Sequence, residues 1–161
     1  MKKITYILVV CTGNTARSPV GSYLGNYYAK KYKSNLIFDS AGFINAFSYI
    51  QPESQEYLDS KGIDHSNFKP KLINRQLLEK QDLILTMESS HSYDIIRNFD
   101  NVKDINKITY TLKEFNGETH NIDIIDPYYT SNEIYRKVLK IIDENVEKAV
   151  KKIIKINESR S

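Results

Sequence analysis

A nearly continuous apolar run close to the N-terminus limits the possible folds more than any other stretch of the sequence. The residues from Ile4 to Val10 are mostly β-branched or aliphatic, which is typical of a strand buried on both faces of a parallel sheet. Shorter runs of this kind recur at 36–38, 83–86 and 108–110. Helical patterns separate the runs, over about 18–31, 52–61, 74–80, 89–98 and 130–153. This alternation predicts a single α/β domain over residues 1–161, with a doubly wound parallel sheet and helices on both faces.

Three sequence signals predict where helices begin and end. Ser18 followed by Pro19 predicts an N-cap and a proline in the first turn. Gly62 predicts the end of the second helix. The segment Thr130-Ser131-Asn132-Glu133 predicts a capping box at the start of the last helix. We interpret the lysines on the outer face of that helix as a solvated surface.

Length and charge restrict the possible partners. The chain has 161 residues and a net charge of +3, which is too small and too dispersed to predict a nucleic-acid groove. No stretch approaches the ~20 apolar residues of a membrane span. The N-terminal run also differs from a secretory signal or a lipoprotein cleavage site, because Thr5 interrupts it and Val10 precedes the cysteine. We therefore expect a cytoplasmic protein with no nucleic-acid or membrane partner, and the oligomeric state stays open.

The chain contains one cysteine, Cys11. A single thiol excludes an internal disulfide, a paired-thiol redox motif and a thiolate-rich zinc site. It leaves two interpretations, a buried apolar filler or a nucleophile, and the filler is the commoner case for a free cysteine.

The position of Cys11 favours the nucleophile. In open parallel sheets, ligands bind beyond the carboxyl ends of the strands, and Cys11 begins the loop at that end of the first strand. Gly13 and Asn14 tolerate positive φ, so the loop can turn its backbone N–H groups inward around an anion. The following helix start adds a positive dipole, and Arg17 adds a planar pair of donors for two phosphate oxygens. A thiol in such a positive environment ionises readily and becomes nucleophilic.

The loop Cys11-Thr12-Gly13-Asn14-Thr15-Ala16-Arg17-Ser18-Pro19 resembles the signature loop of the low-molecular-weight protein tyrosine phosphatases. The resemblance continues along nearly the whole chain in the family's order. It includes Ser40-Ala41-Gly42, Asp82-Leu83-Ile84-Leu85-Thr86-Met87, Thr111-Leu112-Lys113-Glu114-Phe115 and Asp126-Pro127-Tyr128-Tyr129. The Asp126-Pro127 pair carries particular weight because it is independent of the first motif.

This resemblance implies a hydrolase that cleaves phosphate monoesters through a phosphocysteine intermediate, without a metal or other cofactor, on a phosphorylated protein substrate. Its catalytic residues would be Cys11 as nucleophile, Arg17 as oxyanion ligand and Asp126 as general acid and base. The phosphate would be held by the loop residues Thr12, Gly13, Asn14, Thr15, Ala16, Arg17 and Ser18.

The resemblance also implies residues that support the loop and line the substrate cleft. Asn14, Ser18 and Ser40 would support the loop, the Ser18 hydroxyl donating to the thiolate. Tyr128 and Tyr129 would form an aromatic wall beside the leaving group. The opposite wall is expected from the segment after Gly42, with Phe47 or Tyr49 as its aromatic residue.

Three positions depart from the family pattern. Ala16 replaces a second cysteine that can protect the nucleophile as a disulfide, so we expect peroxide to drive Cys11 further along the oxidation ladder. Phe68 lies where many members have a histidine that supports the loop, and we expect Asn67 to substitute for it. Thr15 replaces an aliphatic residue and resembles a branch that acts on phosphoarginine.

Four functions therefore stay open. The paired tyrosines favour phosphotyrosine, whereas Thr15 favours phosphoarginine as the alternative substrate. Arsenate reduction would require an external thiol, and a non-catalytic anion-binding module would not require Asp126. The three histidines, His65, His91 and His120, show no metal-ligand spacing and are predicted to be ordinary surface residues.

Overall fold

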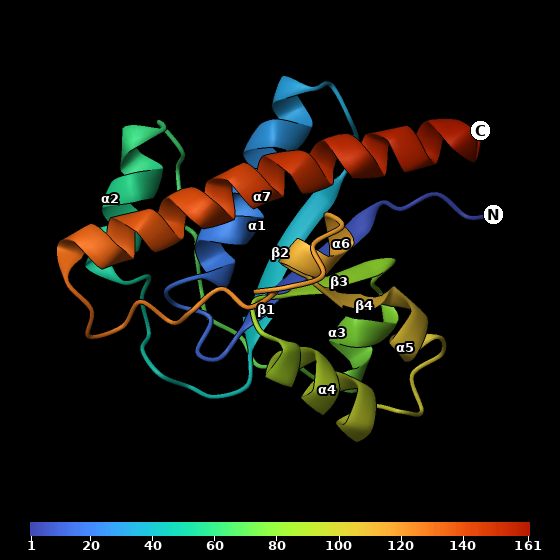
Figure 1. The fold of residues 1–161 in the computed structure, drawn as a ribbon, viewed down its shortest axis with the longest axis horizontal. Coiled ribbons are helices and arrows are strands. Elements are labelled where there is room, and N and C mark those ends of the chain that lie inside the picture. Colours follow the sequence, from blue (N-terminus) through green and yellow to red (C-terminus); the bar gives the residue numbers. More distant parts are fainter.

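The computed structural model describes residues 1–161, and a four-stranded parallel sheet forms its centre (Figure 1). The strands are β1 (Tyr6–Cys11), β2 (Ile37–Gly42), β3 (Leu83–Thr86) and β4 (Thr109–Thr111). Their spatial order is β2-β1-β3-β4, and all three pairings are parallel. The predicted α/β fold with a parallel sheet is confirmed, and Cys11 ends the strand that lies between two neighbours.

Seven helices cover the two faces of the sheet. They are α1 (Ser18–Lys31), α2 (Pro52–Ser60), α3 (Arg75–Glu79), α4 (Ser89–Asn98), α5 (Ile105–Ile108), α6 (Leu112–Phe115) and α7 (Asn132–Ser159). Side chains of β1 alternate between two apolar clusters: Ile7 and Val9 pack with residues of α1 and α7, and Leu8 and Val10 with residues of α3, α4 and α5. Helices therefore bury both faces of the strand that carries Cys11.

Two predicted helix starts are displaced by one residue. The N-cap of α1 is Arg17, and Ser18 is already inside the helix. At α7 the N-cap is Ser131, whose hydroxyl accepts a hydrogen bond from the Ile134 N–H, so the predicted capping box at Thr130 is wrong. The Thr130 hydroxyl instead donates to the Pro127 carbonyl and closes the preceding turn. In both cases a side chain expected to cap a helix serves the neighbouring loop.

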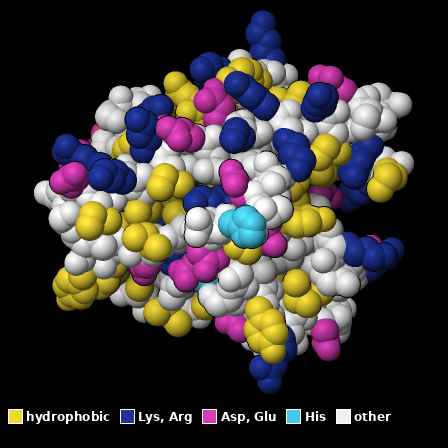
Figure 2. Space-filling model, in the orientation of Figure 1, with side chains coloured by type: hydrophobic (Ala, Val, Ile, Leu, Met, Phe, Trp, Pro, Cys, Tyr) yellow, Lys and Arg dark blue, Asp and Glu magenta, His cyan; other side chains and the backbone are white.

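The outer face of α7 carries charges of both signs. Figure 2 shows Lys and Arg side chains interspersed with Asp and Glu over this part of the molecule. Lys137 pairs with Glu133, and Lys151 pairs with Glu147, each one turn apart along the helix. This mixture supports the interpretation of a solvated surface. No helix combines the length and the apolarity that crossing a membrane requires.

Candidate active site

Cys11 lies at the bottom of the loop that joins β1 to α1. Its side chain is buried, and its thiol is free. The Ser18 hydroxyl lies 3.0 Å from Sγ, and the Ser18 backbone N–H donates to Sγ over 3.4 Å. The positive end of α1 thus points at the sulfur, and these groups stabilise negative charge on it.

The buried Asn14 side chain holds the loop in its curved shape. Asn14 has a φ of 55°, in the left-handed region that asparagine tolerates. Its Nδ2 donates to the hydroxyls of Ser18, at 2.9 Å, and Ser40, at 2.8 Å. Its Oδ1 accepts from the Lys71 backbone N–H at 3.0 Å, so this contact comes from Lys71 and not from the expected Asn67. The structure therefore brings together the three residues predicted to support the loop.

Gly42 allows the segment after β2 to pack directly on the loop. A Cβ atom at this position would lie 2.8 Å from both the Asn14 nitrogen and the Thr12 carbonyl oxygen. The Thr12 carbonyl also accepts hydrogen bonds from the N–H groups of Phe43 and Ile44. These backbone contacts bring residues 44–51 to the rim of the loop.

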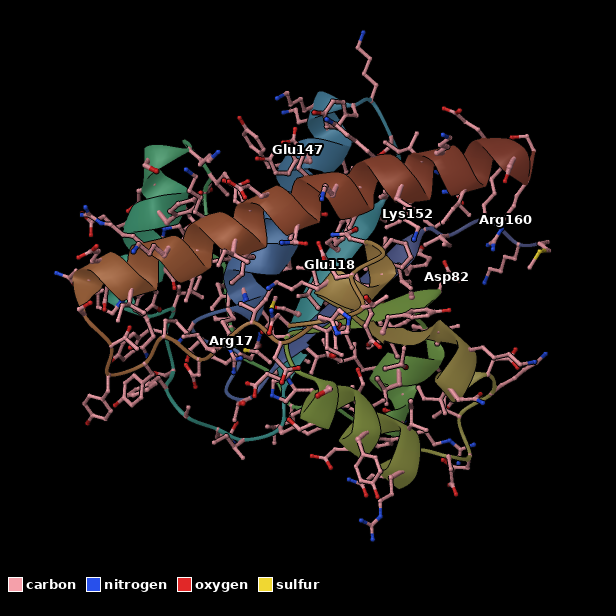
Figure 3. The ribbon with its side chains drawn as sticks, in the orientation of Figure 1. Arg17, Asp82, Glu118, Glu147, Lys152 and Arg160 are labelled. Carbon is pink, nitrogen blue, oxygen red and sulfur yellow. The ribbon has the colours of Figure 1, made fainter.

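Arg17 is 1% exposed and lies among the loops between α1 and α4 (Figure 3). Its Nη1 donates to Glu88 Oε2 at 2.5 Å and to the Ile124 carbonyl at 2.6 Å. Its Nη2 donates to Thr12 Oγ1 at 3.3 Å. Its buried Nε–H has no partner. Since a guanidinium carries five N–H donors, Nε–H and one Nη2–H remain, and this pair forms the edge that binds two oxygens of one anion.

A cavity of about 180 Å³ opens above this loop. Its floor is formed by Cys11 and the loop residues, and its walls are formed by Ile44, Ala46, Phe47, Gln51, Asp126 and Tyr128. The Phe47 and Tyr128 rings lie 5.5 Å apart at 60°, edge to face. Tyr49 packs behind Phe47, with ring centroids 5.7 Å apart. Phe47 is therefore the aromatic residue of the wall predicted after Gly42.

Asp126 lies at the mouth of the cavity. Its side chain is 47% exposed, its Oδ1 accepts the Tyr128 N–H at 3.1 Å, and its Oδ2 lies 3.8 Å from Arg17 Nη2. Tyr128 lines the cavity wall, whereas Tyr129 is 91% exposed and is absent from the cavity lining. The predicted pair of wall tyrosines thus reduces to Tyr128, because Tyr129 sits at a φ of 65° that turns the chain towards α7.

Gln51 contributes a buried donor that has no bonding partner in the protein. Gln51 is 8% exposed, and its Nε2 is buried without a hydrogen bond. Its backbone N–H donates to the carbonyl of Thr15 at 2.9 Å, and Thr15 also lines the cavity. An unpaired buried donor is unfavourable, so a ligand oxygen that accepts from Gln51 Nε2 would be stabilised.

Glu88 and His91 are the residues that the sequence interpretation missed. His91 is 5% exposed, so its prediction as a surface residue is wrong, whereas His120 is exposed and His65 pairs with Asp59 at the surface. His91 Nε2 lies 3.0 Å from Thr12 Oγ1. Its burial and the Arg17 charge hold the pKa of His91 below the ordinary value of 6.5. The Glu88-x-x-His91 spacing at the start of α4 was the available signal.

A larger groove, of about 750 Å³, lies between α2 and α7. Its buried acid, Asp143, is bonded by the hydroxyls of Tyr28 and Tyr57 and pairs with Lys61. These polar groups satisfy one another, so the smaller cavity at Cys11 is the candidate active site.

An open guanidinium edge beside a nucleophilic sulfur suits a tetrahedral oxyanion, and the helix start provides the same preference. Fold and site together therefore define a class, the phosphatases that use a cysteine nucleophile.

Comparisons with known proteins specify the family. The profile described as "Low molecular weight phosphotyrosine protein phosphatase" matches residues 6–159. A protein-arginine-phosphatase of Bacillus subtilis is 32% identical over 150 residues, covering 92% of this chain and 97% of that protein. The low molecular weight protein-tyrosine-phosphatase PtpB of Staphylococcus haemolyticus is 33% identical over 138 residues, covering 83% and 89%. The structure of the YwlE arginine phosphatase from Geobacillus stearothermophilus is similar with a TM-score of 0.85 and 26% identity, covering 98% of this chain and 97% of that one.

The chain belongs to the low molecular weight phosphotyrosine protein phosphatase family. The predicted family and enzyme class, a cysteine-based protein phosphatase, are confirmed.

Proposed function

We propose that this chain removes phosphate from phosphotyrosine in proteins through a phosphocysteine at Cys11. One observation carries the proposal: the buried Nε–H of Arg17 has no hydrogen-bond partner, and Arg17 lines the same cavity as Cys11. A buried donor on a permanently charged group is unfavourable unless an acceptor arrives, and a phosphate oxygen is such an acceptor.

In the first step, the Cys11 thiolate attacks phosphorus as the bond from phosphorus to the leaving oxygen breaks. Arg17 and the loop amides hold the equatorial oxygens, where charge is spread in the transition state. Asp126 gives its proton to the leaving oxygen, a role that suits its place at the cavity mouth.

In the second step, Asp126 takes a proton from a water molecule that attacks the phosphocysteine. The bond from phosphorus to sulfur breaks, and the thiolate and inorganic phosphate are released. The Ser18 hydroxyl, 3.0 Å from Sγ, then donates to the departing thiolate.

Phe47 and Tyr128 favour phosphotyrosine as the substrate. Their rings contact each other edge to face and both line the cavity, so they offer an aromatic surface against which a phenyl ring can pack. Asp126 then lies beside the phenolic oxygen that requires a proton.

Phosphoarginine is a second candidate, and Thr15 favours it. Thr15 lines the cavity, and its hydroxyl oxygen can accept a hydrogen bond from a guanidinium N–H, a group that a phenyl ring lacks. Two relatives with the name protein-arginine-phosphatase, from Bacillus subtilis and Geobacillus stearothermophilus, support this alternative.

Matched peptides that differ only in phosphotyrosine or phosphoarginine test the choice of substrate. We expect a higher kcat/KM on phosphotyrosine, and we expect Thr15→Ile to increase that preference. Higher activity of the wild type on phosphoarginine, reversed by Thr15→Ile, would replace our first candidate with the second.

An Asp126→Asn variant should lose about 10²–10⁴-fold in kcat on the phosphotyrosine peptide.

The remaining alternatives make other predictions. An arsenate reductase would need an external thiol, because Cys11 is the only cysteine. A non-catalytic binding module would bind phosphate but would not hydrolyse phosphate esters. We place the enzyme in the cytoplasm as part of the proposal, with phosphorylated proteins as its substrates.

A further inference from the structure

The His91 ring is held in one tautomer. Its Nδ1 lies 3.2 Å from the Glu88 backbone nitrogen, and a backbone N–H can only donate. Nδ1 is therefore the acceptor, and in the neutral ring the proton resides on Nε2. Stacking of the ring on Phe43, with centroids 5.4 Å apart at 29°, fixes its plane.

The Nε2–H of His91 donates to Thr12 Oγ1 over 3.0 Å. The same oxygen accepts from Arg17 Nη2 over 3.3 Å. Since a hydroxyl has two lone pairs, these two donors occupy both of them. The Thr12 hydroxyl proton is left without a protein acceptor, and Thr12 lines the cavity above Cys11.

The surroundings of His91 keep this arrangement in place. The ring is buried, and the positive charge of Arg17 opposes a second positive charge on it, whereas Glu88, Asp94 and Asp123 act in the opposite direction. Protonation would convert Nδ1 into a donor facing the Glu88 N–H. The neutral ring is therefore the form that supports Thr12.

We propose that His91 is a positioning residue of the phosphate site: through its bond to Thr12, it fixes the guanidinium of Arg17 and directs the Thr12 hydroxyl proton towards a phosphate oxygen. Thr12 would thus contribute a side-chain donor in addition to its backbone. This inference rests on the proposed function, because it requires phosphate in the cavity.

Four variants and a matched control test the inference. Thr12→Val removes the hydroxyl at nearly constant shape, and His91→Phe removes both nitrogens while retaining a ring against Phe43. The third variant carries both changes, and the fourth, Thr12→Ser, retains the hydroxyl. His120→Phe, at an exposed histidine far along the chain, controls for the loss of a histidine as such.

Inhibition by inorganic phosphate and kcat/KM on p-nitrophenyl phosphate are the readouts, with thermal unfolding to confirm folding. A hydrogen bond to a charged group corresponds to a factor of about 10–100. We expect Thr12→Val and His91→Phe each to weaken phosphate inhibition and to lower kcat/KM by such a factor. The double variant should be no worse than Thr12→Val, because His91 acts through Thr12. Thr12→Ser keeps the hydroxyl and should therefore be inhibited by phosphate as the wild type is. His120→Phe should match the wild type in both readouts.

Additive losses in the double variant would overturn the inference, since His91 would then act independently of Thr12. Wild-type phosphate inhibition in Thr12→Val would overturn it as well. Both results presuppose an active wild type, so they differ from failure of the proposed function, in which the wild type neither hydrolyses p-nitrophenyl phosphate nor binds phosphate.

Discussion

At the scale of single residues, Arg17 shows how far the site depends on positions outside the signature loop. The loop motif identifies this arginine, but its orientation comes from Glu88, 71 residues away, and from the Ile124 carbonyl, 107 residues away. His91 reaches the loop from a separation of 79 residues. Sequence spacing finds residues that act within one loop, whereas contacts made by packing α4 against that loop become visible only in the fold.

Stability should depend on pH through His91. Its pKa is lowered in the folded protein, mainly by burial and then by Arg17, so below about pH 6.5 the unfolded chain binds the proton more readily. The free energy of unfolding should therefore fall as the pH drops below 6.5, by up to about 1.4 kcal/mol per pH unit from this group, and the loss should end below the folded pKa. Urea unfolding of the wild type and His91→Phe across this range measures the difference. Parallel pH profiles would contradict the buried, neutral ring.

At the scale of elements, β2 contributes to the site through its last residue. Its register with β1 places Gly42 opposite Cys11, so the chain leaving β2 passes directly over the loop. The two strands were predicted from their apolar runs, and their pairing follows from the parallel fold. The close packing of the following segment depends on Gly42 having no side chain.

Gly42→Ala should therefore impair catalysis more than folding. The new Cβ would meet backbone atoms of Thr12 and Asn14 at 2.8 Å, so the loop must shift. A displacement of about 1 Å in a reacting group can lower the rate about 10²-fold, and we expect a loss of this order in kcat/KM. Gly62→Ala is the matched control: no atom lies within 4 Å of its Cβ, but its φ of +70° makes alanine unfavourable. It should lower the melting temperature and leave kcat/KM unchanged; the opposite pattern in the two variants would refute the assignment.

At the scale of the whole molecule, the sequence predicted the order of strands and major helices, because periodic apolar residues reflect burial on one or two faces. It did not predict α5 or α6, which have four residues each and too few positions to show a period. The sequence also did not predict that the end of α7 packs against the N-terminal segment. Asn157 bonds the backbone of Ile4, and Arg160 donates to the Lys2 carbonyl, so the two chain ends lie together (Figure 3). The capping box failed for a related reason, since the hydroxyl of Thr130 was required by the turn that carries Asp126.

The central claim is that Cys11 carries the phosphoryl group between the two steps, and acid-quenched mass spectrometry tests it most directly. In Asp126→Asn, p-nitrophenyl phosphate should still react in the first step, because p-nitrophenolate is a stable leaving group, whereas attack by water lacks its base. We therefore expect the added mass of one phosphoryl group on the peptide that contains Cys11, and none when Cys11→Ala is combined with Asp126→Asn. Phosphate release by Cys11→Ala at the wild-type rate, or an adduct on another residue, would contradict this account.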